Sequence, residues 1–422
     1  MAEMTVRRWG WPGWPRIAAG FGLGVLLAGG QAPFDLWFIA LPALAGVVWL
    51  VAGAGSPRAA AWIALFAGAG HFAAALSWIV EPFLIDVARH GWMAPFAVLF
   101  MSFGLALFWA VAAGIAAFAA TPARRALAFA LTLCLAELAR GTVLTGFPWA
   151  LPGHIWVVTP LAQLAALIGP NGLMLMTALA AALPVAFGYR GLAASAALLA
   201  AVAGFGVWRL AGPDPAPARA VTLRLVQPNA EQHLKWDPAQ ARILFERQLA
   251  FTAALPRPDL TIWPETAVPY LLNGSPGALE AIAAAADDAP VAFGIQRTEG
   301  WRGFNSMVVT GAGGAVTALY DKHHLVPFGE YIPFGDLAAD LFGLTAFAAQ
   351  EGNGYSAGAA AMLLDLGPEL GRVLPLICYE AVFPQDLRAA PGRADWILQI
   401  TNDAWFGTLT GPYQHLAQAR LR

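Results

Sequence analysis

The sequence predicts a multi-domain membrane protein, with an N-terminal α-helical transmembrane bundle over residues 1–210 and a water-facing α/β domain over residues 220–422. Apolar residues form 59% of the chain and charged residues 12%, whereas soluble domains average roughly 45–50% and about 25%. The acidic residues are concentrated in the second part, with five up to residue 210 and 21 beyond it. A Pro-rich segment at 211–219, reading AGPDPAPAR, marks the linker between the two parts.

Seven apolar segments in the first part are long enough, or nearly so, to cross about 30 Å of hydrocarbon as helices. They cover residues 16–32, 36–54, 59–80, 92–119, 124–140, 171–188 and 192–210. The first segment follows three arginines and has features of a signal peptide. Six further segments follow it and no small-residue cleavage site does, so we expect an uncleaved anchor.

The arginines of the connecting loops indicate how the bundle is oriented. Counting alternate loops, seven arginines lie on one side and three on the other. Cytoplasmic loops carry the excess of positive charge, so the N-terminus is expected in the cytoplasm. An odd number of crossings then places the second part on the extracytoplasmic face.

Two features of the first part have two interpretations each. Glu137 and Arg140 lie one helical turn apart, so they form either a structural ion pair or a contact with substrate. The segment 141–160 is apolar but interrupted by prolines and rich in tryptophan. It predicts either a re-entrant or interfacial element, or a simple loop in the aromatic belt.

In the second part, short β-branched and aromatic runs indicate strands. These runs cover residues 220–227, 259–265, 290–296, 305–311, 315–322, 372–380 and 395–403. Asp-Pro at 237–238 and Ser-Pro at 275–276 are typical helix starts and predict helices to about residues 255 and 286. Strands separated by helices indicate a layered domain, whose sites usually form at the strand ends.

Cys378 is one of two cysteines and stands where the last apolar residues of the run 372–380 give way to polar ones. A thiol that attacks a carbonyl needs a proton acceptor and a group that stabilises the oxyanion. Glu265 and Lys322, each at the end of a predicted strand, can supply these roles. Taken singly, the three residues have plainer interpretations as a core cysteine, a surface acid and a solvated lysine. The other cysteine, Cys134, lies in an apolar helix, so no disulfide framework is expected.

Four motifs together carry a resemblance to a known family. They are WPETA at 263–267, DKHHLVPFGEYIP at 321–333, CYE at 378–380 and NDAWFG at 402–407. This pattern resembles the Glu-Lys-Cys arrangement of the nitrilase superfamily, in the form carried by bacterial apolipoprotein N-acyltransferases. The resemblance implies that the second part is a nitrilase-like α-β-β-α sandwich.

The resemblance also implies a two-step acyl transfer through a thioester on cysteine. The acyl chain would come from a membrane phospholipid and pass to the α-amino group of the N-terminal diacylglyceryl-cysteine of an apolipoprotein. The matching catalytic positions are Glu265 as general base, Lys322 as stabiliser of the intermediate, Cys378 as nucleophile and Glu330 as supporting acid. The matching substrate-binding positions are Trp236, Tyr379 and Glu380.

The expected setting is the bacterial inner membrane, crossed several times, with the second part in the periplasm. No cofactor or metal is expected, because His323 and His324 are adjacent rather than at ligand spacing. We expect a monomer, and the near-zero net charge of -2 gives no reason to expect a nucleic-acid partner. Family members continue beyond the NDAWFG region, so a chain ending at Arg422 is expected to lack a C-terminal part.

Two other functions remain open on the residues alone. A membrane-anchored amidase would use the same glutamate, lysine and cysteine, with water replacing the amine. A non-catalytic scaffold or transporter would use the second part to bind a partner, but the few intramembrane charges do not indicate an ion pathway.

For the orientation, we expect protease added outside spheroplasts to digest the second part and to spare a tag at the N-terminus. The physical reason is the odd number of crossings that separates the two. Immunoblotting of the tag and of the second part measures this. Digestion of the tag with protection of residues 220–422 would reverse the orientation.

Overall fold

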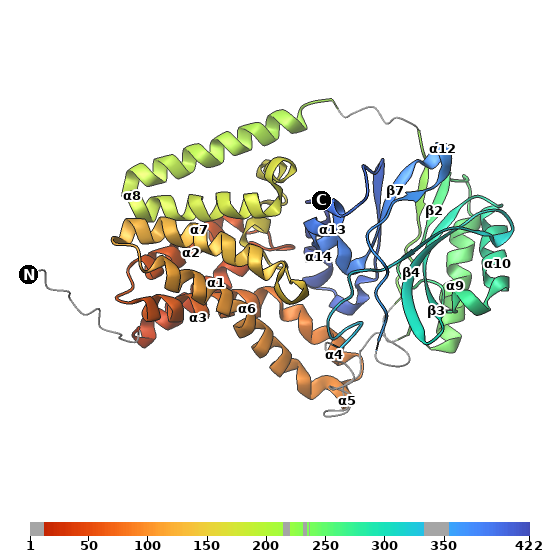
Figure 1. The fold of residues 1–422 in the computed structure, drawn as a ribbon, viewed down its shortest axis with the longest axis horizontal. Coiled ribbons are helices and arrows are strands. Elements are labelled where there is room, and N and C mark those ends of the chain that lie inside the picture. The colour runs from red at the N-terminus through yellow and green to blue at the C-terminus, as the bar shows by residue number, and fades with distance from the viewer. Residues whose placement is uncertain (1–11, 214–219, 231–233, 236, 333–353) are drawn as a thin grey trace, which may run out of the picture. The chain divides into compact units, whose positions relative to one another are not determined.

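The structure, a computed structural model, describes residues 12–213, 220–230, 234–235, 237–332 and 354–422 (Figure 1). It forms two compact units. The helical unit consists of Met1–Asp214 together with Phe406–Arg422, and the sheet unit consists of Pro215–Trp405. Residues 406–422 thus pack in the helical unit, although the sequence predicts them as part of the α/β domain.

The helical unit is built from helices joined by short 3-10 turns. The helices are α1 (Trp14–Ala28), α2 (Trp37–Ala52), α3 (Pro57–Ala75), α4 (Glu81–Leu84), α5 (Val87–His90), α6 (Ala94–Ala116), α7 (Pro122–Arg140), α8 (Ala165–Leu210) and α14 (Gly411–Ala419). The turns are η1 (Ser77–Val80), η2 (Gly91–Met93), η3 (Val143–Thr145), η4 (Pro152–Trp156) and η5 (Pro160–Leu164). Helix starts follow local chemistry, since α3 and α7 begin with proline and are capped by the side chains of Ser56 and Thr121.

α8 is a hairpin of two helical arms (Figure 1). The chain reverses at Gly188, whose φ of 59° and ψ of -135° are accessible to glycine and strained for other residues. Across the hairpin the hydroxyl of Ser195 donates a hydrogen bond to the carbonyl of Ala180 at 2.8 Å. The two predicted segments 171–188 and 192–210 are the arms of this hairpin.

The predicted membrane spans can be compared with the lengths of the apolar helices in the structure. Among the described residues, Val87–Ala116 and Pro160–Leu210 are long and apolar enough to cross a membrane. A third candidate forms if Pro57–Ala75 and Ser77–Leu84, which meet at a bend of 62°, are one broken span. Seven crossings therefore stay a prediction.

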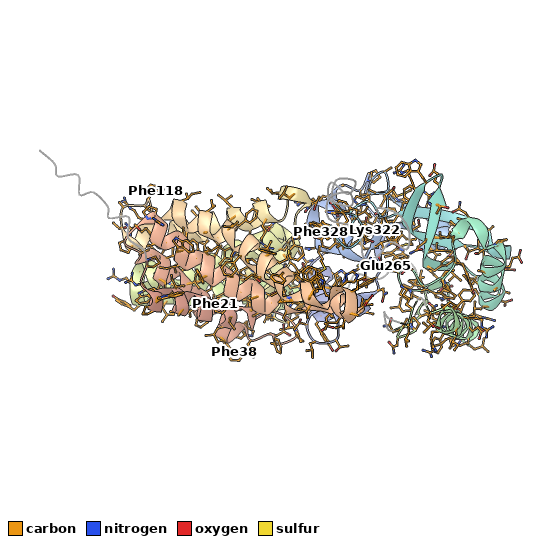
Figure 2. The ribbon with its side chains drawn as sticks, turned by 90° about the horizontal axis from the view of Figure 1, so that it is seen from below. Phe21, Phe38, Phe118, Glu265, Lys322 and Phe328 are labelled. Atoms are coloured by element: carbon orange, nitrogen blue, oxygen red, sulfur yellow. The ribbon has the colours of Figure 1, made fainter. Side chains whose placement is uncertain are left out.

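Large apolar side chains lie on the outside of the helical unit. Phe21, Phe38 and Phe118 are 39%, 57% and 74% exposed (Figure 2). Exposed aromatic and aliphatic side chains in such number are typical of a surface that contacts lipid rather than water.

The segment 141–160 is largely buried in the helical unit. Its carbonyl groups accept hydrogen bonds from side chains, with Gln31 bonding to Leu151 at 3.1 Å and His71 to Ala150 at 2.8 Å. Buried irregular backbone needs such partners because water does not reach it. The segment is therefore irregular backbone held inside the helical unit, and its interpretation as a re-entrant or interfacial element stays a prediction.

Glu137 and Arg140 form a buried ion pair at the end of α7. Arg140 Nε lies 2.9 Å from Glu137 Oε2, and the guanidinium also donates to the carbonyl of Phe147. Trp109 Nε1 donates to the other carboxylate oxygen of Glu137. The pair is thus structural, and it holds the beginning of the segment 141–160 against α7.

α14 is fixed to the helical unit by polar contacts of one glutamine. Gln414 accepts a hydrogen bond from Trp149 Nε1 at 2.7 Å and donates one to the carbonyl of Ala75 at 3.0 Å. Phe406 packs against Trp78 and Trp149, with ring centroids 4.8 Å and 5.7 Å away. These long-range contacts explain why residues 406–422 belong to the helical unit.

The sheet unit contains two sheets. The first has five strands in the order β1 (Leu223–Leu225), β2 (Leu260–Ile262), β3 (Val291–Glu299), β4 (Arg302–Thr310) and β5 (Val316–Asp321). Its first two pairings are parallel and the next two antiparallel. The second has β6 (Leu364–Asp365), β7 (Arg372–Ile377) and β8 (Trp396–Ile400), with β7 in the middle. The predicted strands are confirmed, although several are shorter, and β6 was not predicted.

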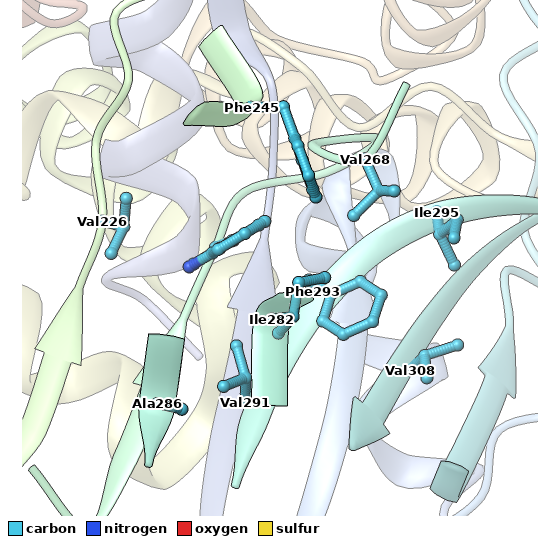
Figure 3. Packing of buried hydrophobic residues seen from close by; sticks show 10 residues of the cluster. Val226, Phe245, Val268, Ile282, Ala286, Val291, Phe293, Ile295 and Val308 are labelled. Atoms are coloured by element: carbon cyan, nitrogen blue, oxygen red, sulfur yellow. The ribbon is translucent and has the colours of Figure 1, made fainter. Parts of the chain in front are cut away.

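The core of the first sheet packs against two helices, α9 (Pro238–Ala253) and α10 (Pro276–Ala286). Ten buried apolar residues form this cluster, from Val226 on the strand side to Ile282 on α10 (Figure 3). Trp263 lies fully buried in it, and its indole N–H donates to the hydroxyl of Thr252 at 2.9 Å. The start of both helices at Asp-Pro and Ser-Pro agrees with the prediction.

For this core, we expect Ile282→Ala to destabilise the sheet unit by about 2–5 kcal/mol, because it removes apolar contacts and leaves a cavity. Ile243→Ala on α9 is the matched control, since Ile243 is 44% exposed and Ile282 is 0% exposed. Hydrogen exchange of amides in β3, measured by mass spectrometry of the full chain, reports the free energy of opening. Equal effects of the two substitutions would contradict the packing described here.

Candidate active site

Glu265 stands just beyond β2 on a turn that is folded closely against β3. The N–H of Gly294 donates to the carbonyl of Pro264 at 3.1 Å, and the N–H of Ala267 donates to the carbonyl of Gly294 at 2.9 Å. A Cβ at position 294 would lie 2.3 Å from the backbone nitrogen of Thr266, so only glycine permits this approach. The turn directs a carboxylate that is only 6% exposed into the interior.

Lys322 follows β5, and its side chain is 1% exposed. Its Nζ lies 2.7 Å from Glu330 Oε2 and 3.8 Å from Glu265 Oε1. Glu265 and Lys322 lie in the same region of the sheet unit (Figure 2). The structure therefore brings together the predicted base, the predicted stabilising lysine and the predicted supporting acid.

Backbone and amide donors hold the two carboxylates in place. Asn305 Nδ2 donates to Glu265 Oε1 at 2.7 Å and to Glu330 Oε1 at 3.1 Å. The N–H of Asn402 donates to Glu265 Oε2 at 3.0 Å, and that of Val326 donates to Glu330 Oε2 at 2.8 Å. Several such bonds hold each buried carboxylate in one orientation.

Cys378 directly follows β7 and opens the 3-10 turn η8 (Cys378–Val382). Its φ of 51° is unusual for a residue with a side chain and is typical of strained functional positions. Burial raises the pKa of the Cys378 thiol well above its ordinary value, the charge of Glu265 raises it further, and the charge of Lys322 lowers it. The thiol is therefore protonated at rest and needs a base to become a nucleophile.

The charge on Lys322 is set by its neighbours. Burial favours loss of its proton, but the charges of Glu330, Cys378 and Glu265 outweigh burial and raise the pKa of Lys322 above its ordinary value. Lys322 is therefore a fixed cation at neutral pH. A cation held beside a thiol stabilises both the thiolate and an oxyanion formed from it.

Glu380, predicted as a substrate-binding residue, is fully buried and stands two residues after the cysteine. One carboxylate oxygen accepts hydrogen bonds from the Tyr320 hydroxyl at 2.7 Å and from the N–H groups of His323 and His324 at 2.8 Å and 3.2 Å. The other accepts from the N–H of Ile377 at 2.7 Å. Glu380 thereby joins the turn after Lys322 to the strand that ends at the cysteine.

Of the two other predicted substrate-binding residues, the structure describes Tyr379 but not Trp236. Tyr379 is 4% exposed and packs against Phe383 and His324, with ring centroids 4.8 Å and 5.6 Å away. Trp236 lies outside the described residues. Within the described ranges, no group of three or more His, Cys, Asp or Glu side chains is arranged to hold a metal ion.

Two residues of the site were not singled out from the sequence. Asn305 lies in the middle of β4, where the strand pattern gives no sign of its role. Lys235 is buried, and its Nζ donates to the carbonyl of Glu265 at 3.2 Å and to the hydroxyl of Thr266. A signal for Lys235 exists, because lysine is rare in this chain.

Two family models match the chain, the apolipoprotein N-acyltransferase N-terminal domain over residues 23–183 and carbon-nitrogen hydrolase over residues 222–422. The apolipoprotein N-acyltransferase of Brucella melitensis biotype 1 is 37% identical over 447 residues, which cover 97% of this chain and 82% of the relative. The one from Caulobacter vibrioides is 38% identical over 440 residues, which cover 98% and 81%. A solved CN-hydrolase superfamily protein from Xanthomonas campestris is 23% identical, with a TM-score of 0.29 over 43% of this chain and 64% of that chain.

For the contacts of Glu380, we expect Glu380→Gln to speed exchange of the N–H groups of Ile377, His323 and His324. The amide side chain keeps the shape but accepts less well, and hydrogen bonds to charged groups contribute about 1.5–3 kcal/mol. Exchange should therefore be about ten-fold faster or more, measured by mass spectrometry. Glu369→Gln, at an exposed position, is the control and should change nothing there.

The same contacts should depend on pH in a defined direction. Burial opposes ionisation of Glu380, but the hydrogen bond and charge of His323 and the hydrogen bonds from Ile377 and Tyr320 together outweigh burial and lower the pKa of Glu380 below its ordinary value of 4.5. The contribution of the Glu380 carboxylate to stability is present above its ordinary pKa and is lost as pH falls through the lowered pKa. Burial likewise opposes protonation of His323, but Glu380 raises the pKa of His323. The contribution of protonated His323 to stability is therefore lost as pH rises through this raised pKa. Protection that is lost at pH 5 would contradict these contacts.

Proposed function

Because the chain belongs to the apolipoprotein N-acyltransferase family, we propose that it moves an acyl chain from a membrane phospholipid, through a thioester on Cys378, to the N-terminal diacylglyceryl-cysteine of an apolipoprotein. Family membership makes the protein an acyltransferase of lipoprotein maturation, with a carbon-nitrogen hydrolase fold in its second part. The donor, the thioester and the roles of individual residues are the proposal.

One observation carries the proposal furthest. The buried Cys378 thiol is subject to the charges of Glu265 and Lys322, and the charged atoms of those two groups are 3.8 Å apart. A base, a cation and a thiol gathered in a dry interior are the groups that acyl transfer through a thioester requires.

In the first half-reaction, Glu265 takes the proton of the Cys378 thiol, and the sulfur attacks the ester carbonyl of the phospholipid. A carbon–sulfur bond forms, and the carbonyl oxygen becomes an oxyanion that the Lys322 ammonium stabilises. When the intermediate collapses, the carbon–oxygen bond breaks. Glu265 returns the proton to the departing alcohol, which leaves as a lysophospholipid, and the acyl chain stays on Cys378.

In the second half-reaction, the neutral α-amino group of the lipoprotein attacks the thioester carbonyl. A carbon–nitrogen bond forms, and Glu265 takes a proton from the nitrogen as the oxyanion again faces Lys322. The carbon–sulfur bond then breaks, and the thiolate of Cys378 recovers the proton. All atoms of the amide come from the two substrates, so no cofactor enters the balance.

Glu330 supports this chemistry by keeping Lys322 charged, since its carboxylate lies 2.7 Å from the lysine Nζ. Trp236, Tyr379 and Glu380 are proposed to act in substrate binding, and Glu380 also holds the turn at His323 and His324. We place the protein in the inner membrane as a multi-pass monomer, with a cytoplasmic N-terminus and the sheet unit in the periplasm. Both substrates are anchored in lipid, so an enzyme held in the same bilayer meets them at high effective concentration.

A membrane-anchored amidase is the second candidate function. The match to carbon-nitrogen hydrolase over residues 222–422 favours it, because the same three residues would serve hydrolysis with water as the acceptor. The two functions differ in the acyl donor and in the acceptor of the second step.

For the thioester, we expect the purified protein incubated with phospholipid vesicles to gain the mass of one acyl chain on Cys378, read by peptide mass spectrometry. Cys378→Ala should abolish the adduct, because no sulfur remains to attack. Glu265→Gln should slow its formation by about 10²–10⁴-fold, the usual contribution of a general base. Cys134→Ala is the matched control and should leave the adduct unchanged.

Addition of a diacylglyceryl-cysteine peptide should then discharge the adduct and yield an N-acylated peptide. Transfer that persists in Cys378→Ala would sink the proposal. An adduct that forms with small amides and not with phospholipids would favour the amidase instead.

A further inference from the structure

The chain uses lysine in only two places. It contains two lysines and 22 arginines, and the lysines are Lys235 and Lys322. Both are buried in the sheet unit, and both contact Glu265. All other basic side chains with a permanent charge are arginines, and both lysines lie next to Glu265.

The contacts of Lys235 are specific. Its side chain leaves the loop between β1 and α9, and Nζ donates to the carbonyl of Glu265 at 3.2 Å. Nζ also donates to the hydroxyl of Thr266, the next residue. An ammonium group that bonds to both residues fixes the turn that carries the carboxylate.

That turn needs fixing because it is strained. Thr266 has a φ of 44°, in the left-handed region that β-branched residues avoid. Gly294 of β3 packs against one side of the turn, since a Cβ there would lie 2.3 Å from the nitrogen of Thr266. Lys235 supplies polar contacts to the same two residues, so the direction of the Glu265 carboxylate depends on both.

Charge balance gives Lys235 a second role. Among the residues that the structure describes, Glu265 and Glu330 form salt bridges with one ammonium, that of Lys322. When Glu265 takes the thiol proton, the negative charge moves from its carboxylate to the sulfur of Cys378. A second buried ammonium offsets part of that charge and so favours the thiolate.

We propose that Lys235 is a positioning residue of the acyl transfer, which holds the Glu265–Thr266 turn in its strained conformation and supplies the second cation of the site. This inference rests on the proposed roles of Cys378 and Glu265. It adds to them a group that holds the turn through its bonds to Glu265 and Thr266 and acts on the site through its charge.

The charge of Lys235 fits this role. Burial lowers the pKa of Lys235 to about 8, against the opposing charges of Glu265 and Cys378. Lys235 is therefore still charged at neutral pH, and each negative charge formed nearby strengthens its hold on the proton.

For the test, we compare Lys235→Met, which is close in shape and neutral, with Lys235→Arg, which keeps the charge. Both are made in a Cys134→Ala background, so that iodoacetamide reads Cys378 alone. Cys378 is subject to the charges of Glu265, Lys322 and Asp403. Lys235 is subject to the charges of Glu265 and Cys378. Arg242→Met removes a cation from an exposed position of α9 and is the matched control.

Lys235→Met should slow alkylation of Cys378 at pH 7 by about ten-fold, since a cation that favours the thiolate at this pH is lost. It should also lower kcat of acyl transfer by roughly ten-fold while KM changes less than about two-fold. Lys235→Arg, which keeps the charge, and Arg242→Met should keep the wild-type alkylation rate. Should Lys235→Met not be recovered folded, Lys235→Gln takes its place with the same expected change.

An unchanged alkylation rate at pH 7 in the neutral variant would overturn the inference, and so would an equal loss of rate in Lys235→Arg. Either result, together with an inactive Cys378→Ala, would leave the proposed function standing. Acyl transfer by Cys378→Ala would instead overturn the proposed function itself.

Discussion

The buried contact between one ammonium and two carboxylates is the constraint on which the sheet unit depends. Each ion costs several kcal/mol to remove from water, and only close pairing with further hydrogen bonds offsets that. Lys322 therefore requires Glu265 and Glu330, and these require the donors of Asn305 and Asn402. These five residues come from β4, from the ends of β2, β5 and β8, and from the loop beyond β5. The two sheets must be correctly placed before the charges can be buried.

Much of the site could be predicted because its residues break a local pattern. Glu265, Lys322 and Cys378 each stand at the end of an apolar run, where a reactive side chain is unexpected. Asn305 was missed because an asparagine within a strand gives no such break, and its partners lie 25 and 40 residues away. The contacts of Glu380 were missed for the same reason, since they join residues 56 to 60 positions apart. Periodicity and spacing report local structure, and such pairings are decided only by the folded chain.

Prediction from the sequence meets the same limit in the helical unit. Its apolar segments were predictable, because long apolar runs are visible in the sequence, and the last two segments form the arms of the α8 hairpin. The burial of the segment 141–160 could not be decided, because its tryptophans and prolines suit an exposed belt as well as an interior. Bonds from Gln31 and His71 decide it, and they span 120 and 79 residues. Similarly, the bond from Trp149 to Gln414 spans 265 residues and assigns the end of the chain to this unit.

That last assignment makes the sheet unit an insertion. The polypeptide leaves the helical unit after Asp214 and re-enters it at Phe406, so both ends of the inserted unit are covalently tethered to the same body. Asn402, which bonds to the carboxylate of Glu265, stands four residues before the second tether. Severing the backbone there would remove no reacting group, yet it would release the strand that supplies this donor.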